Sequence, residues 1–337
     1  MSVRDEAMAK HPDFPWLEAG DAAGTDRILR GLGWLEAGEH VERADPAGQG
    51  NMNLTLRVET GQRSFVLKQA RPWVEKYPEI AAPWERSTVE QDFYARAAKI
   101  SGVAEKMPRL IAADAETRLL ALEDLPGARD LSELYADPRT HPLEEEELGG
   151  LALYLARLHA GGNQAGDPRI ENRAMRELNH AHIYCIPLDP QNGLDLDLHE
   201  PGLGAAARAL MGDLEFCSAV RAQGERYLGG GSTLLHGDFF PGSWLRSDLG
   251  LRIIDPEFTF HGEAEFDLGV AVAHFALMRL PAQRARRFLA DYAAALPAAR
   301  VGDQELARKA AVEVMRRLIG VAQLPIPKSE GWRADLL

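Results

Sequence analysis

Alternating hydrophobic and polar positions predict an antiparallel hairpin in the first third of the chain. The segments NLTLRVET at 53–60 and RSFVLKQA at 63–70 alternate with a period of two on either side of a Thr60-Gly61 turn. The later stretch RLIAADAETRLLALEDL at 109–125 predicts two more strands. Residues 42–125 are therefore expected to be rich in β-structure.

A helical period interrupts these strands and then dominates the rest of the chain. One helix is predicted within STVEQDFYARAAKI at 87–100, whose apolar stripe is Val89, Phe93, Ala97 and Ile100. Near the start, Thr25 and Asp26 are predicted to cap a short helix that runs through Ile28, Leu29 and Leu32. Beyond Pro126 the helical patterns lie at 144–160, 205–228, 285–296 and 303–323.

The change of pattern at Pro126-Gly127 predicts a domain boundary. We expect a helical N-terminal extension at 1–41, a strand-rich N-lobe at 42–125 and a mostly helical C-lobe at 126–337. The fold class is therefore α+β.

Charge and composition exclude some classes of binding partner. With 38 basic and 51 acidic residues the net charge is 38 − 51 = −13, which disfavours nucleic acid and anionic membranes. The longest nearly uncharged apolar stretch, at 268–278, is shorter than the roughly 18 residues that span a bilayer. Two cysteines and an N-terminus without an apolar leader are typical of a cytoplasmic protein. The oligomeric state, a homodimer included, is left open.

Three carboxylates stand on turns beside short apolar runs: Asp238, Asp255 and Glu257. Charged side chains are rarely buried unless they are paired or bind metal, so carboxylates braced in this way indicate a held site. The plainer interpretation is that Asp238 only turns the chain, since aspartate is common in loops.

The order of these residues resembles the catalytic and metal-binding loops of kinase-like phosphotransferases. His236-Gly237-Asp238 is followed by Ser243 and then by Asp255-Pro256-Glu257. Upstream stand a glycine-containing turn at 47–53, Lys68, Glu90 and a hinge-like ALEDL at 121–125. About ten residues separate Glu257 from FDLG at 266–269, which favours a small-molecule acceptor over a polypeptide.

Within this superfamily, which includes aminoglycoside phosphotransferases and choline kinases, the chain most resembles the 5-methylthioribose kinase family. The likeness lies in GNMN at 50–53, VLKQARPWV at 66–74, HGDFFPGS at 236–243, IDPEFTFHGEAEFDLG at 254–269 and MRRLIGVAQ at 315–323. It implies a two-lobed protein-kinase-like fold, with ATP and Mg²⁺ as cofactors and a small sugar as the acceptor. Ser243 stands where most relatives have asparagine.

The resemblance also implies a role for each matching residue. Asp238 would be the catalytic base, Asp255 and Glu257 the Mg²⁺ ligands, and Arg316 and Arg317 the contacts to sugar and transferred phosphate. The nucleotide-binding residues would be Gly50, Asn51, Asn53, Lys68, Glu90, Glu123 and Leu125. Backbone N–H groups of the 50–53 loop and a lysine held by a glutamate suit phosphate oxygens.

Some features admit a second interpretation. Periodicity alone puts Ala311, Val314, Leu318 and Val321 on the buried face of the last helix, which would leave the two arginines solvated. Trp73 and Trp84 could cover the nucleotide or pack at the surface. Asp267 and His236 are expected to steady the loop at Asp238 and not to transfer protons.

The stretch 171–198 does not match the methylthioribose kinase family. His180, His182 and Cys185 within it could bind metal, but polar packing is the better interpretation of an unmatched His-x-His.

The sequence thus predicts an ATP-dependent kinase of a small hydroxylated metabolite, foremost a 5-methylthioribose-like sugar phosphorylated at its anomeric hydroxyl. Two alternatives remain. A kinase of an aminoglycoside, an amino alcohol or another sugar would need a different acceptor pocket. A nucleotide-binding pseudokinase has only Ser243 in its favour.

Overall fold

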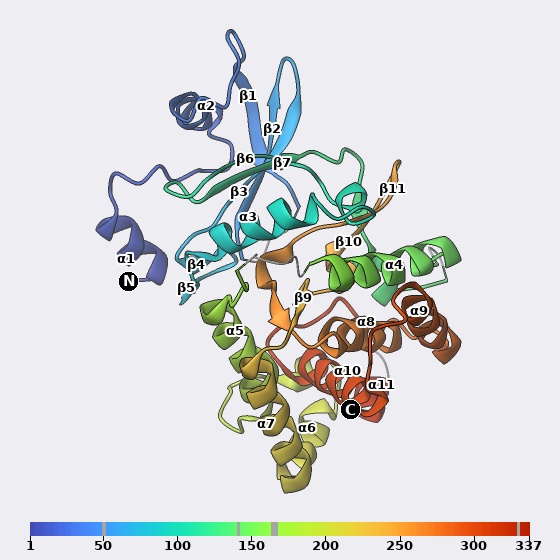
Figure 1. Cartoon of the computed structure of the whole chain (residues 1–337). Helices are drawn as coiled ribbons and strands as arrows, with labels where there is room; N and C mark the ends of the chain where they lie inside the picture. The colour runs from blue at the N-terminus through green and yellow to red at the C-terminus, as the bar shows by residue number, and fades with distance from the viewer. Residues whose placement is uncertain (49–51, 140–141, 163–167, 329–330) are drawn as a thin grey trace. The chain divides into compact units, whose positions relative to one another are not determined.

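The computed structural model describes residues 1–48, 52–139, 142–162, 168–328 and 331–337 (Figure 1). The chain divides into two compact units. The first unit comprises Met1–Lys99 and Met107–Pro126, and the second comprises Ile100–Lys106 and Gly127–Leu337. The first unit is built on a β-sheet and the second is mostly helical, as the sequence predicts.

The first unit contains a five-stranded antiparallel sheet with the order β1-β2-β3-β7-β6. Its strands are β1 (Val41–Pro46), β2 (Leu54–Thr60), β3 (Ser64–Gln69), β6 (Leu110–Asp114) and β7 (Leu119–Glu123). The predicted hairpin is confirmed, with Leu54 opposite Gln69 and Glu59 opposite Ser64. Strict alternation puts Leu56, Val58 and Leu67 in one core, where all three are inaccessible to solvent.

The N-terminal segment packs against the same core through Leu17 and Leu29. It forms α1 (Val3–Lys10) and α2 (Ala22–Gly31). The predicted cap at Thr25 and Asp26 is wrong, because α2 begins earlier. The carboxylate of Asp21 accepts a hydrogen bond from the Gly24 N–H at 2.8 Å, so the free N–H of the first turn is satisfied there.

The predicted internal helix is α3 (Arg86–Ala97), and Phe93, Ala97 and Ile100 of its expected stripe are buried. The hairpin before it, β4 (Trp73–Val74) and β5 (Tyr77–Ala81), carries one of the two tryptophans in question. Trp73 and Trp84 both contact Trp16, with ring centroids 5.1 and 5.7 Å apart. This favours packing within the first unit as their role.

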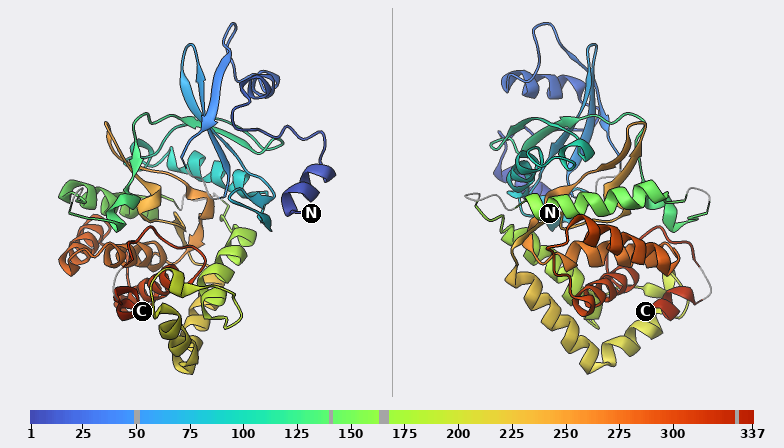
Figure 2. Two further views of the ribbon diagram at one scale, coloured as in Figure 1. Left: turned by 180° about the vertical axis from the view of Figure 1, so that it is seen from behind. Right: turned by 45° about the vertical axis from the view of Figure 1, so that its right-hand side comes forward.

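The second unit contains the remaining helices, several of which lie in pairs (Figures 1 and 2). They are α4 (Glu145–Gly161), α5 (Arg173–His180), α6 (Leu203–Gly212), α7 (Leu214–Gly229), α8 (Glu265–Leu277), α9 (Ala282–Ala295), α10 (Asp303–Ile319) and α11 (Trp332–Leu336). Helix α10 packs along α8, and α9 packs along α4.

Two predicted helices differ from the observed ones. The pattern at 205–228 is split into α6 and α7, because Asp213 caps a new helix by accepting from the Phe216 N–H at 2.9 Å. The pattern at 303–323 ends at Ile319, since Gly320 leaves the helical conformation.

Short strands brace the carboxylate-bearing loops of the second unit. They are β8 (Arg129–Asp130), β9 (Thr233–Leu235), β10 (Trp244–Ser247), β11 (Gly250–Ile253) and β12 (Phe260–Gly262). The strands β9 and β12 pair with each other, and β10 lies between β8 and β11. The loop at Asp238 leaves β9, and the loop at Asp255 leaves β11.

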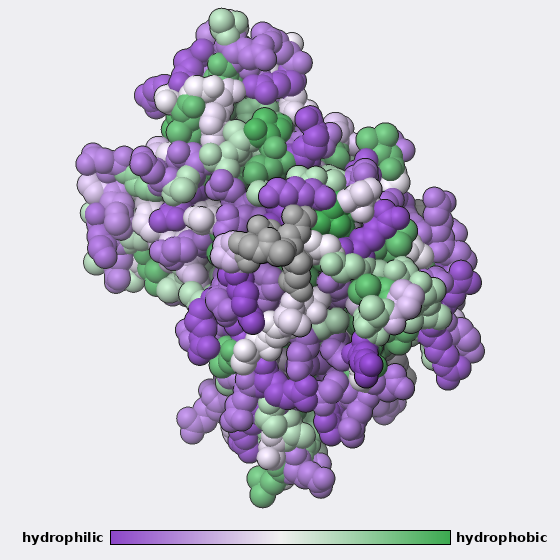
Figure 3. All heavy atoms as spheres, in the orientation of Figure 1, coloured by the Kyte–Doolittle hydropathy of each residue, from purple (hydrophilic) through white to green (hydrophobic). Residues whose placement is uncertain are grey.

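Hydrophilic residues cover most of the face drawn in Figure 3, and hydrophobic ones are scattered over it. Among the described residues, none of the helices combines the length and apolar character needed to cross a membrane.

Substituting alanine at two helix glycines is expected to change the free energy of unfolding in opposite directions. A Cβ at Gly269 of α8 would lie 2.6 Å from the Lys309 Cβ of α10, whereas a Cβ at Gly149 of α4 would meet only an Asp291 oxygen at 3.8 Å. Gly269→Ala is therefore expected to lower the free energy of unfolding by about 1–3 kcal/mol through overpacking. Gly149→Ala is expected to raise it by up to about 1 kcal/mol through helix propensity. Urea unfolding measures both, and a stabilising Gly269→Ala would contradict the close packing of α8 on α10.

Candidate active site

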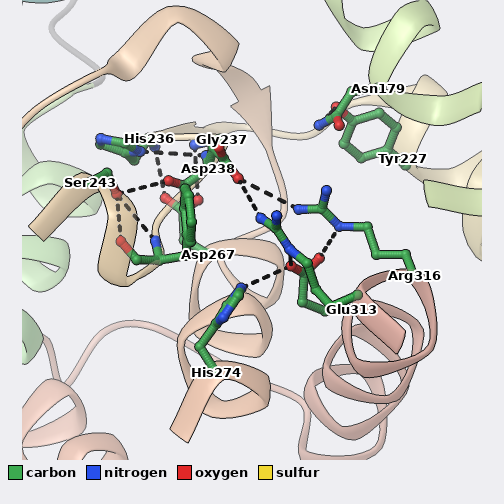
Figure 4. Close-up of polar contacts among 12 residues, drawn as sticks. Asn179, Tyr227, His236, Gly237, Asp238, Ser243, Asp267, His274, Glu313 and Arg316 are labelled. Carbon is green, nitrogen blue, oxygen red and sulfur yellow. Dashed lines mark hydrogen bonds and ion pairs between the residues drawn. The ribbon is translucent and has the colours of Figure 1, made fainter. Parts of the chain in front are cut away.

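The loop after β9 is held by one carboxylate from α8. Asp267 accepts hydrogen bonds from the backbone N–H groups of His236 at 2.7 Å and Gly237 at 3.0 Å (Figure 4). Gly237 has φ +85°, and a Cβ there would lie 2.1 Å from the Phe258 carbonyl oxygen, so only glycine fits. The expected structural role of Asp267 is confirmed.

His236 orients the same loop. It is fully buried, and burial lowers the pKa of its imidazole, so the ring is neutral at pH 7. Its Nε2 lies 3.0 Å from the Ile254 carbonyl oxygen, and its Nδ1 lies 3.4 Å from the Asp238 N–H. A neutral ring satisfies both contacts when Nε2 donates and Nδ1 accepts. His236 thus links the loop at Asp238 to the loop at Asp255, as expected of an orienting residue.

Ser243 closes the other end of the loop. Its hydroxyl oxygen lies 3.0 Å from the Asp238 carbonyl oxygen and 2.8 Å from that of Phe240, and it accepts from the Phe240 N–H at 3.2 Å. The side chain is buried. Ser243 therefore has a structural use in the loop that does not depend on a ligand.

The Asp238 carboxylate is partly exposed to solvent and also faces two arginines. Its side chain is 25% exposed, and its Oδ1 lies 3.5 Å from Arg316 Nη2 (Figure 4). The same oxygen lies 3.4 Å from Arg317 Nη2. Burial raises the pKa of its carboxyl above the ordinary value, although both arginines act to lower it. The structure thus brings together three of the predicted site residues in the second unit.

The solvated position that periodicity predicts for Arg316 and Arg317 is wrong. Both side chains are buried, whereas Ala311, expected in the core, is exposed and Val314 is half-buried. The buried face of α10 carries Glu313 beside apolar residues, and its carboxylate pairs with both guanidinium groups. Glu313 Oε2 accepts from Arg316 Nε at 2.5 Å, and Oε1 accepts from Arg317 Nε at 2.8 Å.

Behind Glu313 lies a neutral histidine. His274 Nε2 is 3.0 Å from Glu313 Oε1, and Tyr135 Oη is 2.5 Å from His274 Nδ1. Burial lowers the pKa of His274 to about 4, although the bond to Glu313 opposes this. Burial disfavours the charged form of Glu313 too, but the two arginines and His274 hold its pKa well below the usual range.

Sequence reasoning missed Glu313, His274 and Tyr135. The spacing of Glu313 three and four residues before the arginines was a usable signal, since such residues are neighbours on a helix. His274 lies inside an apolar run and Tyr135 lies 139 residues before it, so nothing local connects them.

The loop after β11 holds the two predicted metal ligands. Asp255 is exposed and has φ +61°, and Glu257 is 7% exposed. The Asn172 amide donates to the carbonyl oxygens of Glu257 and Thr259, both at 2.9 Å, and thereby fixes this turn. Asn172 lies near the start of the 171–198 stretch.

Within the described ranges, His, Cys, Asp and Glu side chains form no group of three or more that could hold a metal ion. His180, His182 and Cys185 are accordingly not gathered into such a group. Cys185 Sγ lies 3.7 Å from His180 Nδ1, and the His180 ring packs against Tyr184. Packing accounts for these contacts.

In the first unit, Lys68 Nζ pairs with Glu90 Oε1 at 2.8 Å, and both side chains are buried. The predicted residues Gly50 and Asn51 lie outside the described residues. Glu123 ends β7 and accepts from the Arg109 N–H at 3.1 Å, and Leu125 follows it half-buried.

Asn53 reveals a residue that sequence reasoning missed. Its side-chain oxygen accepts from the buried Arg86 Nε at 2.9 Å. Arg86 also donates to the carbonyl oxygens of Met52, Arg71 and Pro83. Arg86 thus fixes the last two residues, Met52 and Asn53, of the predicted phosphate-binding turn.

The neutral state of His274 predicts a pH dependence of stability. The folded protein does not protonate this ring until about pH 4, whereas the unfolded chain does so near 6.5. Between these values the unfolded state binds the extra proton, so acid lowers the free energy of unfolding, by up to about 3 kcal/mol from this group. Urea unfolding at pH 7.5 and 5 measures the loss. His274→Gln should reduce it, and the exposed His40→Gln should not. An equal loss in all three proteins would contradict a buried neutral ring.

Comparison with known proteins shows which family the chain belongs to. Residues 43–302 match the phosphotransferase enzyme family. A methylthioribose kinase from Exiguobacterium sibiricum is 28% identical over 263 residues, which cover 75% of this chain and 65% of that protein. The chain therefore spans less than two thirds of the length of this relative. The predicted resemblance to methylthioribose kinases is confirmed.

Among solved structures, a glucosamine kinase in complex with glucosamine, ADP and inorganic phosphate has a TM-score of 0.53 at 19% identity, covering 89% of this chain and 79% of that one. Choline kinase LicA from Streptococcus pneumoniae has a TM-score of 0.50 at 15% identity, with coverages of 87% and 86%. These likenesses confirm the predicted kinase-like α+β fold. Because the family match covers more than half of the chain, the protein belongs to the phosphotransferase enzyme family.

Proposed function

We propose that the protein is an ATP- and Mg²⁺-dependent kinase that phosphorylates a hydroxyl of a small uncharged metabolite. The first candidate acceptor is a 5-methylthioribose-like sugar, phosphorylated at its anomeric hydroxyl. The observation that carries the proposal is Asp238, a partly exposed carboxylate on a loop fixed by Asp267 and facing two buried arginines. Phosphoryl transfer depends mainly on positioning and charge stabilisation, which this arrangement is built to supply.

Asp238 is proposed to orient the acceptor hydroxyl and accept its proton. The backbone on either side of it is held by Asp267 and Ser243, so the position of its main chain does not depend on a ligand. The raised pKa of Asp238 makes it a better base than an exposed carboxylate.

Asp255 and Glu257 are proposed to hold Mg²⁺. The donor set fits, because Mg²⁺ takes oxygen ligands and is commonly bound by one or two carboxylates together with substrate phosphates and water. Asn172 fixes the turn that bears both side chains. Bound there, the ion would neutralise phosphate charge.

The nucleotide is proposed to be bound by the first unit. Lys68, held by Glu90, suits phosphate oxygens, and the 50–53 turn with Asn53 would offer backbone N–H groups. Glu123 and Leu125 stand where β7 ends and would bind the base. The glucosamine kinase neighbour is described with ADP, which supports an adenine nucleotide here.

The charges around Arg316 and Arg317 bear on the acceptor. Two guanidinium groups face two carboxylates, Asp238 and Glu313, so the cluster is balanced when His274 is neutral. A cationic acceptor such as choline or an aminoglycoside would meet the arginines without a surplus of carboxylate. Hydroxyl groups of a neutral sugar would find donors and an acceptor, and the methylthioribose kinase relatives point to the same class.

An acceptor panel tests the proposal. ADP release with ATP and Mg²⁺ is measured for 5-methylthioribose, 5-deoxyribose, ribose, glucosamine, choline and several aminoglycosides. We expect turnover with 5-methylthioribose that stops in EDTA and returns with excess Mg²⁺. Reactions without acceptor measure background ATP hydrolysis.

Other outcomes are equally informative. Preference for choline or an aminoglycoside would contradict the acceptor class but leave the kinase assignment in place. ATP binding without transfer to any acceptor would contradict the kinase assignment and favour a nucleotide-binding role.

A further inference from the structure

The second unit contains a row of buried polar side chains that ends at Asp238. It runs from Tyr135 through His274 to Glu313, and from there to Arg316 and Arg317. Figure 4 shows the part from His274 through Glu313 to Arg316. All five side chains are more than nine-tenths buried. They come from the 3₁₀ helix Leu131–Tyr135 and from α8 and α10, so distant parts of the chain converge on the arginine pair.

Glu313 fixes the orientation of each guanidinium group. It accepts from the Nε atoms of both arginines, which turns the Nη2 atoms toward Asp238. These Nη2 atoms stop 3.5 and 3.4 Å from Asp238 Oδ1. Charge-assisted N–H···O contacts normally close to about 2.7–2.9 Å. The Arg317 contact is a long hydrogen bond and the Arg316 contact is a long ion pair, so both arginines are directed at Asp238 but held at the far limit of contact with it.

His274 and Tyr135 fix Glu313 in turn. A neutral imidazole beside a carboxylate must donate from Nε2, so its Nδ1 is an acceptor and accepts a hydrogen bond from the Tyr135 hydroxyl. This sets the tautomer and the ring plane, as outer partners do for histidines that bind metals. Phe240 covers the Arg317 guanidinium at 4.6 Å and contacts the His274 ring at 5.3 Å.

We propose that Glu313, oriented by His274 and Tyr135, is a positioning residue that keeps Arg316 and Arg317 from closing on Asp238. Their Nη2 groups then remain available to the phosphoryl group as it is transferred, and Asp238 remains free to take the acceptor proton. This inference rests on the proposed kinase function and adds to it a buried support on which the two arginines depend.

Glu313→Gln tests the proposal because it removes the charge and keeps the shape. Without the competing carboxylate, the arginines would close on Asp238 and lower its pKa. We expect kcat to fall about 10- to 100-fold, the range typical when a support of a functional group is lost. The acid limb of the kcat profile should also move to lower pH, because Asp238 would then ionise at lower pH.

A matched control lies on the same helix. Glu305 of α10 pairs with Arg226 at 3.1 Å and Arg308 at 2.6 Å, and its side chain is 18% exposed. Glu305→Gln makes the same change of charge at the other end of α10 and should leave kcat and its pH profile unchanged. Glu313→Asp retains the charge and should keep the acid limb close to that of the wild type.

A merely structural role for Glu313 would change the amount of folded enzyme but not the shape of the profile. An unshifted acid limb in Glu313→Gln, with activity in proportion to the folded fraction, would therefore overturn the proposal. So would an equal shift in Glu305→Gln.

Thermal unfolding provides a readout that does not need activity. Asp238→Asn and Glu313→Gln each leave the arginine pair with one carboxylate, and the double variant leaves it with none. We expect the double variant to lose more melting temperature than the two single losses combined, because both carboxylates neutralise the same cations. Additive losses would overturn the proposal. Coupled losses in a protein without kinase activity would instead contradict the proposed function alone.

Discussion

Two buried guanidinium groups on one helix are the constraint on which the second unit depends. Arginine cannot shed its charge inside a protein, so Arg316 and Arg317 require carboxylates nearby. Glu313 supplies one from the same helix, and Asp238 supplies the other from the loop after β9. The need to bring these groups together ties α10 to the 236–243 loop.

The same constraint explains why many hydrogen bonds hold the 236–243 loop. An Asp238 carboxylate that must face two cations needs a fixed backbone, which Asp267 provides from α8 and Ser243 from within the loop. His236 connects this loop to the loop of Asp255, because its imidazole contacts the Ile254 carbonyl oxygen. Close packing of α8 on α10 at Gly269 then keeps Asp267 and Glu313 on neighbouring helices.

Strands and loops could be predicted from the sequence where the pattern that identifies them lies within a single segment. Period-two alternation located β2 and β3, because their buried face shows in their own sequence, and short apolar runs located β6 and β7. Asp238 and Asp255 were expected on turns beside short apolar strands, and they follow β9 and β11. Helix ends were less predictable, because the caps at Asp21 and Asp213 compete with other polar residues nearby.

The buried arginine pair could not be predicted from periodicity, which counts charged residues as solvated. Its burial depends on partners from other segments, such as Asp238, and on a carboxylate whose significance appears only when His274 and Tyr135 are placed behind it. Arg86 is a second case, because two of its carbonyl partners, those of Met52 and Arg71, lie 34 and 15 residues before it in the chain. Apart from the spacing of Glu313 three and four residues before the arginines, these networks are set by tertiary contacts that show no pattern along the chain.

The most direct test of this account is the rate of a single turnover, measured as transfer of labelled γ-phosphate from ATP in wild type and in Asp238→Asn. If Asp238 takes the acceptor proton, the substitution should slow transfer by about 10²–10⁴-fold, the usual contribution of a positioned base, while ATP affinity stays close to that of the wild type. Transfer within about tenfold of wild type, a barrier change of only about 1.4 kcal/mol, would contradict it.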